Sequence, residues 1–207
     1  AFRYSVTPLD FSGRIIIKSS IRGKVKNAQW AQPALEVTGT GSTSAAQYLA
    51  HRSKESGFGL AYAFAQNVSG SGIGSGYAQG ADHVTRSADM DAVEGQTYVV
   101  EKYVSVCDSR DYPEAELGAQ AAASAEEYAQ SGYDALLREH AAYWSSFWND
   151  ADLQIEGDDA AQQGVRFALF QLAQSTGRDG KTNCGANGLT GEAYNGHVFW
   201  DSEMYIM

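Results

Sequence analysis

The sequence predicts an α+β chain that begins with an antiparallel β-sandwich and continues with helices. Large apolar and small residues alternate over residues 57–68, which is typical of a strand. The composition changes after Pro113, where Ala, Glu and Gln become frequent. Residues 1–103 carry 10 Lys or Arg and 8 Asp or Glu, whereas residues 104–207 carry 5 and 17. This difference in charge indicates two structural units.

The strand prediction is clearest at residues 58–68. Phe58, Leu60, Tyr62, Phe64 and Val68 occupy even positions, and Gly or Ala occupies nearly every odd position between them. Such a strand has one face of large apolar side chains and one face of small residues. We expect the small-residue face to pack closely against another layer of the fold.

Further strands are predicted along residues 1–106. Tyr98, Val100, Val104 and Val106 repeat the period of two, and residues 14–22 and 45–52 are less regular candidates. The glycine-rich segment 69–80 lacks the spacing of a phosphate-binding loop, so we predict a flexible hairpin tip there. Short strands separated by turn residues favour an antiparallel sandwich.

Helices are predicted after residue 113. Residues 114–130 are strong helix formers, and Ser131 and Gly132 end that run. Apolar side chains then recur at spacings of three and four over residues 134–149, which predicts an amphipathic helix. Trp144, Phe147 and Trp148 could form a ligand platform, but aromatic residues at this spacing more often belong to a core. His140 is interpreted as a core histidine.

A third helix is predicted over residues 158–176. Asp158 or Asp159 would cap its first turn, and Gly177 would end it. Phe167, Phe170 and Leu172 are expected to face inward.

The composition excludes several classes of partner. The formal net charge is −10, so we expect neither nucleic acid nor an anionic membrane surface to be a partner. No apolar run approaches the ~18 residues of a membrane span, and we recognise no signal peptide. Cys107 and Cys184 are interpreted as free core thiols in a reducing compartment, and we expect a cytoplasmic protein.

Two common motifs are rejected. Residues 175–182 end in Gly-Lys-Thr, but Ser175 replaces the first glycine of a phosphate-binding loop and a helix precedes it. The four histidines lack the spacing of a zinc site, so we predict no metal.

The last 25 residues carry the chemistry that we consider most informative. Glycines in this stretch allow tight turns, and they precede His197, Trp200, Asp201 and Glu203. An aromatic ring packs on the C–H face of a sugar, and a carboxylate accepts hydrogen bonds from vicinal hydroxyls. A purely structural Trp–Asp pair explains these residues about equally well.

A resemblance to a known family decides between these interpretations. Residues 188–203, GLTGEAYNGHVFWDSE, closely resemble the signature of glycoside hydrolase family 65, which includes maltose, trehalose, kojibiose and nigerose phosphorylases and some α-glucosidases. Further similar segments are Ile16–Ile21 with Gly23 and Asn27, Gly157–Asp158, Gln162–Gly164, Arg166–Phe167 and Gln171.

The resemblance implies a multidomain fold. Residues 1–112 would form the end of an N-terminal antiparallel β-sandwich, residues 113–156 a helical linker, and residues 157–207 the first helices of an (α/α)6 catalytic barrel. We therefore expect the chain to be a fragment, with the remainder of its own polypeptide as a partner. A homodimer is a further expectation.

The resemblance also implies a function. It assigns the glucose site to Trp200 and Asp201 and supporting roles to His197 and Glu203, and it places the catalytic acid and the phosphate-binding residues downstream. The expected activity is that of an inverting phosphorylase, which converts an α-glucosidic disaccharide and inorganic phosphate to β-glucose 1-phosphate and a sugar, without a further cofactor. The alternatives are an α-glucoside hydrolase of the same family, or a fragment that only binds carbohydrate or serves a structural role.

Overall fold

A computed structural model describes residues 1–26, 32–70, 73–179, 182, 184–189 and 193–200. The chain divides into two units, residues 1–140 and 141–207. The strands are β1 (Phe2–Val6), β2 (Gly13–Arg22), β3 (Leu35–Ser42), β4 (Ala46–Ser53), β5 (Gly59–Ser69), β6 (Ile73–Gln79), β7 (His83–Ala92) and β8 (Tyr98–Asp108). The helices are η1 (Glu114–Glu116), α1 (Leu117–Ser131), α2 (Tyr133–Ala151), α3 (Asp159–Ser175) and η2 (Ala193–Gly196).

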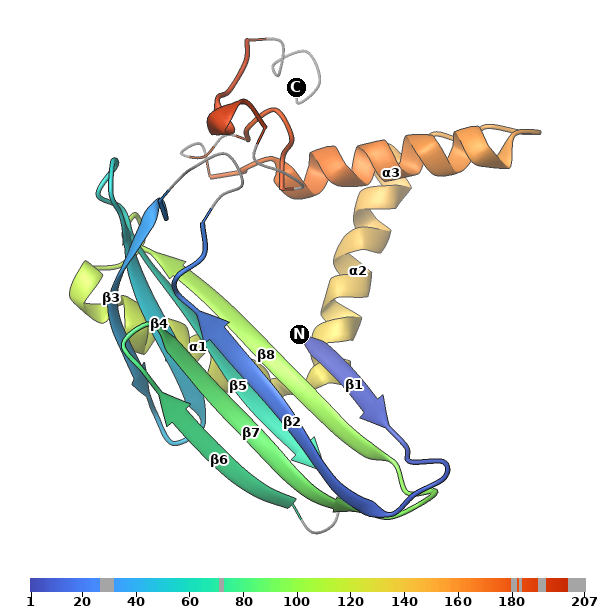
Figure 1. Cartoon of the computed structure of the whole chain (residues 1–207). Coiled ribbons are helices and arrows are strands. Elements are labelled where there is room, and N and C mark those ends of the chain that lie inside the picture. Colours follow the sequence, from blue (N-terminus) through green and yellow to red (C-terminus); the bar gives the residue numbers. More distant parts are fainter. Residues whose placement is uncertain (27–31, 71–72, 180–181, 183, 190–192, 201–207) are drawn as a thin grey trace. The chain divides into compact units, whose positions relative to one another are not determined.

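Two antiparallel sheets make up most of the first unit (Figure 1). The larger sheet has the strand order β1-β8-β5-β4-β3, and the smaller sheet has the order β2-β7-β6. The outer strand β1 pairs with β8 in a register that places Phe2 opposite Lys102. This arrangement confirms the predicted antiparallel sandwich.

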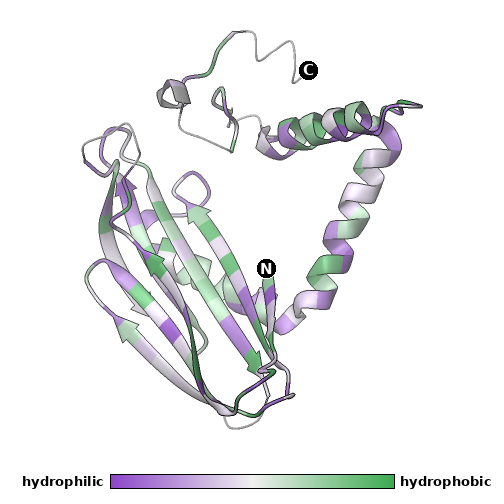
Figure 2. Ribbon diagram, turned by 45° about the vertical axis from the view of Figure 1, so that its right-hand side comes forward, coloured by the Kyte–Doolittle hydropathy of each residue, from purple (hydrophilic) through white to green (hydrophobic). Residues whose placement is uncertain are grey.

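The two sheets enclose an apolar core. Leu49 and Phe64 of the larger sheet pack with Val84 of the smaller sheet. Nearer the other end of the sandwich, Met90 of β7 packs with Tyr98 of β8. Figure 2 shows hydrophobic and hydrophilic residues alternating along the strands, as expected where one face of a strand is buried.

A third layer, helix α1, covers the opposite face of the larger sheet. Ala61, Ala63 and Ala65 of β5 are buried there, together with Ala121 and Ala125 of α1. Their short side chains allow the helix to approach the sheet closely. The predicted role of the small-residue face is therefore confirmed.

Strand β8 is covered on both faces, but along different parts of its length. Tyr98 packs with Met90 of the smaller sheet, whereas Cys107, on the opposite face, packs with α1. Val104 and Val106, which lie on the same face as Tyr98, are 37% and 56% exposed. The alternation therefore predicted the strand correctly, but the buried face changes where α1 takes over as the covering layer.

The predicted hairpin tip at residues 69–80 is wrong for most of its length, because Ile73–Gln79 forms strand β6. This strand pairs with β7 at the edge of the smaller sheet, so it needs only one neighbour. Gly76 lies close to Ser87, and an added Cβ would be 2.5 Å from Ser87 Oγ. This glycine therefore permits a close approach between β6 and β7. Composition alone does not distinguish a glycine in such a strand from a glycine in a turn.

Gly118, near the start of α1, allows the helix to pack on Tyr48 of β4, because an added Cβ would lie inside van der Waals contact with the Tyr48 ring. We expect Gly118→Ala to destabilise the chain by about 1–3 kcal/mol, the usual cost of overpacking. Urea unfolding measures this change.

Gly39 of β3 is the matched control, because an added Cβ there would meet no atom within 4 Å. Gly39→Ala should leave the chain as stable as the wild type or stabilise it by up to about 1 kcal/mol. Equal unfolding midpoints for the Gly118 and Gly39 variants would contradict the close contact at Tyr48.

An ion-pair network joins β1, β8 and the start of α2. Arg3 donates to Glu101 at 2.8 Å and to both carboxylate oxygens of Asp134 at 2.8 and 2.9 Å, and its guanidinium lies 4.3 Å from the centroid of the Tyr133 ring. The hydrogen bonds from Arg3 lower the pKa of Asp134 below its usual range. Tyr103 donates to the other Glu101 oxygen at 2.5 Å.

Burial and the hydrogen bond to Glu101 raise the pKa of Tyr103 to about 12, from the ordinary value of 10.0. Between these pH values the unfolded chain binds fewer protons than the folded chain at this position, so the free energy of unfolding falls as pH rises. We expect this alkaline loss to be smaller in Tyr103→Phe. The measurement is the urea midpoint at pH 9, 10 and 11.

Tyr4, an exposed tyrosine of β1, provides the control for that experiment. Tyr4→Phe should keep the pH dependence of the wild type. If the Tyr103 and Tyr4 variants lose stability equally over this range, the stated role of Tyr103 is incorrect.

Helices α2 and α3 confirm the two remaining predicted helices, but parts of the prediction are wrong. Asp158 caps α3 by accepting a hydrogen bond from the Ala161 amide at 2.9 Å. The helix ends at Ser175, before Gly177, because the backbone of Thr176 is extended, with φ −83° and ψ 122°. His140 is exposed, since α2 buries none of its residues in this chain.

The aromatic cluster of the second unit is half-buried. The ring of Trp144 on α2 lies 5.3 Å from Phe147, 6.4 Å from Trp148 and 4.8 Å from Phe170 of α3, between centroids. These contacts support a packing role for the cluster. Phe167 and Leu172 of α3, which were expected to face inward, are exposed.

Neither cysteine forms a disulfide, as expected. Cys107 is buried, whereas Cys184 is half-buried, so the prediction of a core position is wrong for Cys184. Among the helices of the described residues, none combines the length and the hydropathy that a membrane span requires.

Candidate functional site: the glycine-rich segment after α3

The segment that follows α3 begins with hydrogen bonds between Thr182 and Asp179. One oxygen of Asp179 accepts hydrogen bonds from the amide of Thr182 at 2.9 Å and from its hydroxyl at 2.7 Å. Arg178 donates to the hydroxyl of Tyr143 on α2, and its guanidinium lies 5.5 Å from the centroid of that ring. The carboxylate of Asp179 would repel a bound phosphate, which agrees with the rejection of a phosphate-binding loop.

Glycines then bring the backbone close to the end of α3. Gly188 has a φ of +55°, and its amide donates to the carbonyl of Gly185 at 2.9 Å. An added Cβ at Gly188 would be 2.9 Å from Cβ of Ser175, the last residue of α3. An added Cβ at Gly185 would be 3.2 Å from Cα of Gly196. These two positions therefore favour glycine because of close approach, and Gly188 also because of its φ.

A second turn, built on η2, follows this contact. Tyr194 and Gly196 have φ values of +58° and +71°, and the amide of His197 donates to the carbonyl of Tyr194 at 3.0 Å. The rings of Tyr194 and Phe199 meet edge to face, with centroids 5.2 Å apart. Val198 and Phe199 connect this turn to Trp200.

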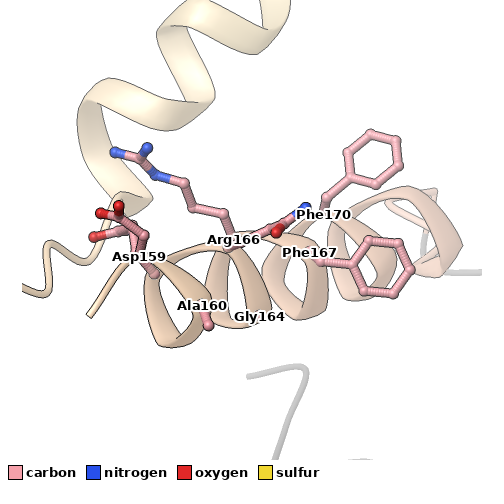
Figure 3. Close-up of a pocket in the computed structure, with 8 residues that line it drawn as sticks. Asp159, Ala160, Gly164, Arg166, Phe167 and Phe170 are labelled. Atoms are coloured by element: carbon pink, nitrogen blue, oxygen red, sulfur yellow. The ribbon is translucent and has the colours of Figure 1, made fainter.

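An open depression lies along α3 in the same unit, lined by residues 159–170 of one helix face (Figure 3). Phe167 and Phe170 project from the helix near one end of this face. Arg166 pairs with Asp152 at 2.6 Å and thereby lowers the pKa of that carboxyl. Side chains of one helix do not enclose a ligand, so this depression is a packing surface and not a complete site.

Comparison with known proteins matches two parts of the chain to one family. Residues 1–147 match the N-terminal domain of glycosyl hydrolase family 65, and residues 166–207 match the central catalytic domain of that family. The chain belongs to glycosyl hydrolase family 65.

Relatives of this family 65 chain include an α,α-trehalose phosphorylase of Thermoanaerobacter brockii, 35% identical over 218 residues. A kojibiose phosphorylase of Halothermothrix orenii is 29% identical over 218 residues. Each alignment covers 100% of this chain and 28% of the relative, so the chain spans about a quarter of their length. A solved structure described as a putative kojibiose phosphorylase from the human microbiome aligns with 94% of this chain, with a TM-score of 0.79 and 22% identity. The alignment covers 26% of the chain in that structure. This last likeness shows the fold.

The site residues predicted for this family 65 chain lie on or after the second turn. His197 and Trp200 are exposed and lie three residues apart on one segment, and Trp200 is 84% exposed. Asp201 and Glu203 lie outside the described residues. Among the described residues, no three His, Cys, Asp or Glu side chains gather closely enough to hold a metal ion.

Sequence reasoning did not select Tyr194 or Phe199. The available signal was a pair of aromatic residues on either side of Gly196 in a glycine-rich stretch. Their contact depends on the left-handed backbone conformation of Tyr194. This conformation is uncommon for a tyrosine, so the residue type does not predict it.

Proposed function

We propose that the complete protein is an inverting disaccharide phosphorylase. It would transfer glucose from an α-glucosidic disaccharide to inorganic phosphate and release β-glucose 1-phosphate and a sugar. The observation that carries this proposal is the alignment of the whole chain with an α,α-trehalose phosphorylase at 35% identity. The kojibiose and maltose phosphorylases among its relatives support the same reaction class.

In this proposal the segment after η2 binds the glucose unit that is transferred. The exposed ring of Trp200 is available to pack on the apolar face of the sugar. Asp201, the next residue, would accept hydrogen bonds from two vicinal hydroxyls, and His197 and Glu203 would support this site. Holding the sugar in one orientation presents its anomeric carbon for attack.

The reaction requires an acid and a nucleophile on opposite sides of the glycosidic bond. A carboxylic acid from outside these 207 residues would protonate the leaving oxygen, and phosphate would attack the anomeric carbon from the opposite face. Phosphate then takes the place of the activated water of an inverting hydrolase, and the configuration is inverted. Phosphate serves as a co-substrate, and the proposal includes no other cofactor.

The proposal extends to the fold and setting of the complete protein. Helix α3 would be the first helix of an (α/α)6 barrel, and further barrel helices would cover its exposed Phe167 and Leu172. The match of residues 166–207 to the central catalytic domain supports this assignment. We also propose a cytoplasmic homodimer.

The test uses the complete protein with maltose, trehalose, kojibiose and nigerose, each with and without phosphate, followed by proton NMR. Phosphate-dependent β-glucose 1-phosphate from one of them is the expected result and identifies the linkage. Free glucose in the absence of phosphate would instead establish an α-glucoside hydrolase. No turnover of any disaccharide would contradict the proposal and favour a carbohydrate-binding role.

A further inference from the structure

Tyr194 has an unusual backbone for a bulky residue. Its φ is +58°, in the left-handed region, where a Cβ is crowded by the carbonyl oxygen of its own residue. The side chain is 62% exposed, so burial in a core does not explain why this conformation is kept. A left-handed residue other than glycine persists where contacts around it hold it in place, and such residues cluster at functional sites.

Two contacts hold Tyr194 in this conformation, and both are to residues just before Trp200. The carbonyl of Tyr194 accepts a hydrogen bond from the amide of His197 at 3.0 Å. The Tyr194 ring contacts the Phe199 ring edge to face, with centroids 5.2 Å apart. The backbone reverses between them at Gly196, with a φ of +71°. Residues 194–199 therefore form a closed turn whose last residue is bonded to Trp200.

The closed turn is linked to the end of α3 through residues 185–188. Gly196 lies against Gly185, and the turn that contains Gly185 continues to Gly188, which lies against Ser175 of α3. The position of Trp200 relative to α3 thus depends on a series of backbone contacts, and the ring contact between Tyr194 and Phe199 closes the turn nearest to Trp200.

We propose that Tyr194 is a positioning residue, whose ring fixes Phe199 and thereby the direction in which Trp200 meets the sugar. The proposal rests on the function proposed above, because it takes Trp200 as part of the glucose site. It assigns Tyr194 no contact with the substrate. The Tyr194 hydroxyl is then dispensable, and the ring is not.

The first test compares two variants of the complete protein. Tyr194→Gly keeps a residue that readily adopts the left-handed conformation and removes the ring, so we expect kcat/KM to fall by about tenfold or more, as for misplaced binding groups. Tyr194→Phe keeps the ring and should stay within about threefold of the wild type. Equal loss in both variants would mean that the hydroxyl acts directly and would overturn the proposal, as would wild-type activity of Tyr194→Gly.

A double variant separates positioning from direct binding. If Tyr194 acts through Phe199, then Tyr194→Gly combined with Phe199→Ala should lose no more activity than the worse single variant. Losses that multiply would show that Tyr194 and Phe199 act independently, which contradicts the proposal.

A readout that does not depend on activity distinguishes failure of this proposal from failure of the proposed function. The complete protein is labelled with 5-fluorotryptophan, and the fluorine signal of Trp200 is assigned by its loss in Trp200→Phe. We expect Tyr194→Gly to shift or broaden this signal and to leave the other tryptophan signals unchanged, whereas Tyr194→Phe changes none. An unchanged Trp200 signal in Tyr194→Gly would overturn the positioning role, even if the wild type proved inactive on every disaccharide.

Discussion

Asp201→Ala in the complete protein is expected to lower kcat/KM for phosphorolysis by about 10²- to 10⁴-fold while leaving the fold intact. Each hydrogen bond to a charged group contributes about 1.5–3 kcal/mol, and the proposed site gives Asp201 two vicinal hydroxyls to bind. Loss of both corresponds to about 3–6 kcal/mol of transition-state stabilisation. The measurement is the initial rate of β-glucose 1-phosphate formation over a range of disaccharide and phosphate concentrations.

Two further variants make that result specific. Asp201→Asn keeps the shape of the side chain and removes its charge, so it should lose a large part of the same activity. Asp150→Ala removes an exposed carboxylate near the end of α2 and should behave as the wild type. Normal turnover and affinity in Asp201→Ala would exclude the proposed role of this residue.

Phe64→Ala is expected to cost about 3–5 kcal/mol of folding stability, the usual cost of emptying the site of a buried aromatic side chain. Phe64 is fully buried between the two sheets, in contact with residues of both. The Lys102 ammonium lies 4.7 Å from the centroid of its ring, and burial lowers the pKa of Lys102. A loss of this size is a large part of the total stability of a domain.

Phe58 provides the comparison, because it lies just before the same strand and is about half exposed. Phe58→Ala should cost less than about 1 kcal/mol. Urea unfolding of both variants, followed by circular dichroism, gives the two values. Similar losses for Phe58 and Phe64 would mean that the core does not lie where the structure places it.

The fold could be predicted from sequence where the local pattern also specified the environment. At β5 the alternation of large and small residues indicated both the strand and the face that α1 covers, and both predictions are confirmed. At β8 the same alternation indicated the strand alone, because the buried face depends on which layer covers each part of it. The pairing of β6 with β7 is a contact between segments, and the glycines of β6 are typical of turns as well as of close strands.

The candidate site shows the same limit. The residues of the signature could be located by their resemblance to a family, and the match to the central catalytic domain covers them. The contacts that shape the turn before Trp200 join residues 175, 185, 188 and 196, and no local pattern predicts them. His140 was misplaced because helical periodicity describes a face of a helix and not what covers that face.

The pairing of β1 with β8 has a consequence for the synthesis of the protein on the ribosome. Phe2 lies opposite Lys102, so β1 finds its partner strand only after about a hundred further residues have been made. At ~5–20 residues per second, this takes several seconds or more, during which the exposed aromatic residues Phe2 and Tyr4 and the polar backbone edge of β1 have no native partner. Contacts so distant along the chain also slow folding itself. The nascent chain is therefore expected to need protection by a chaperone until β8 has left the ribosome.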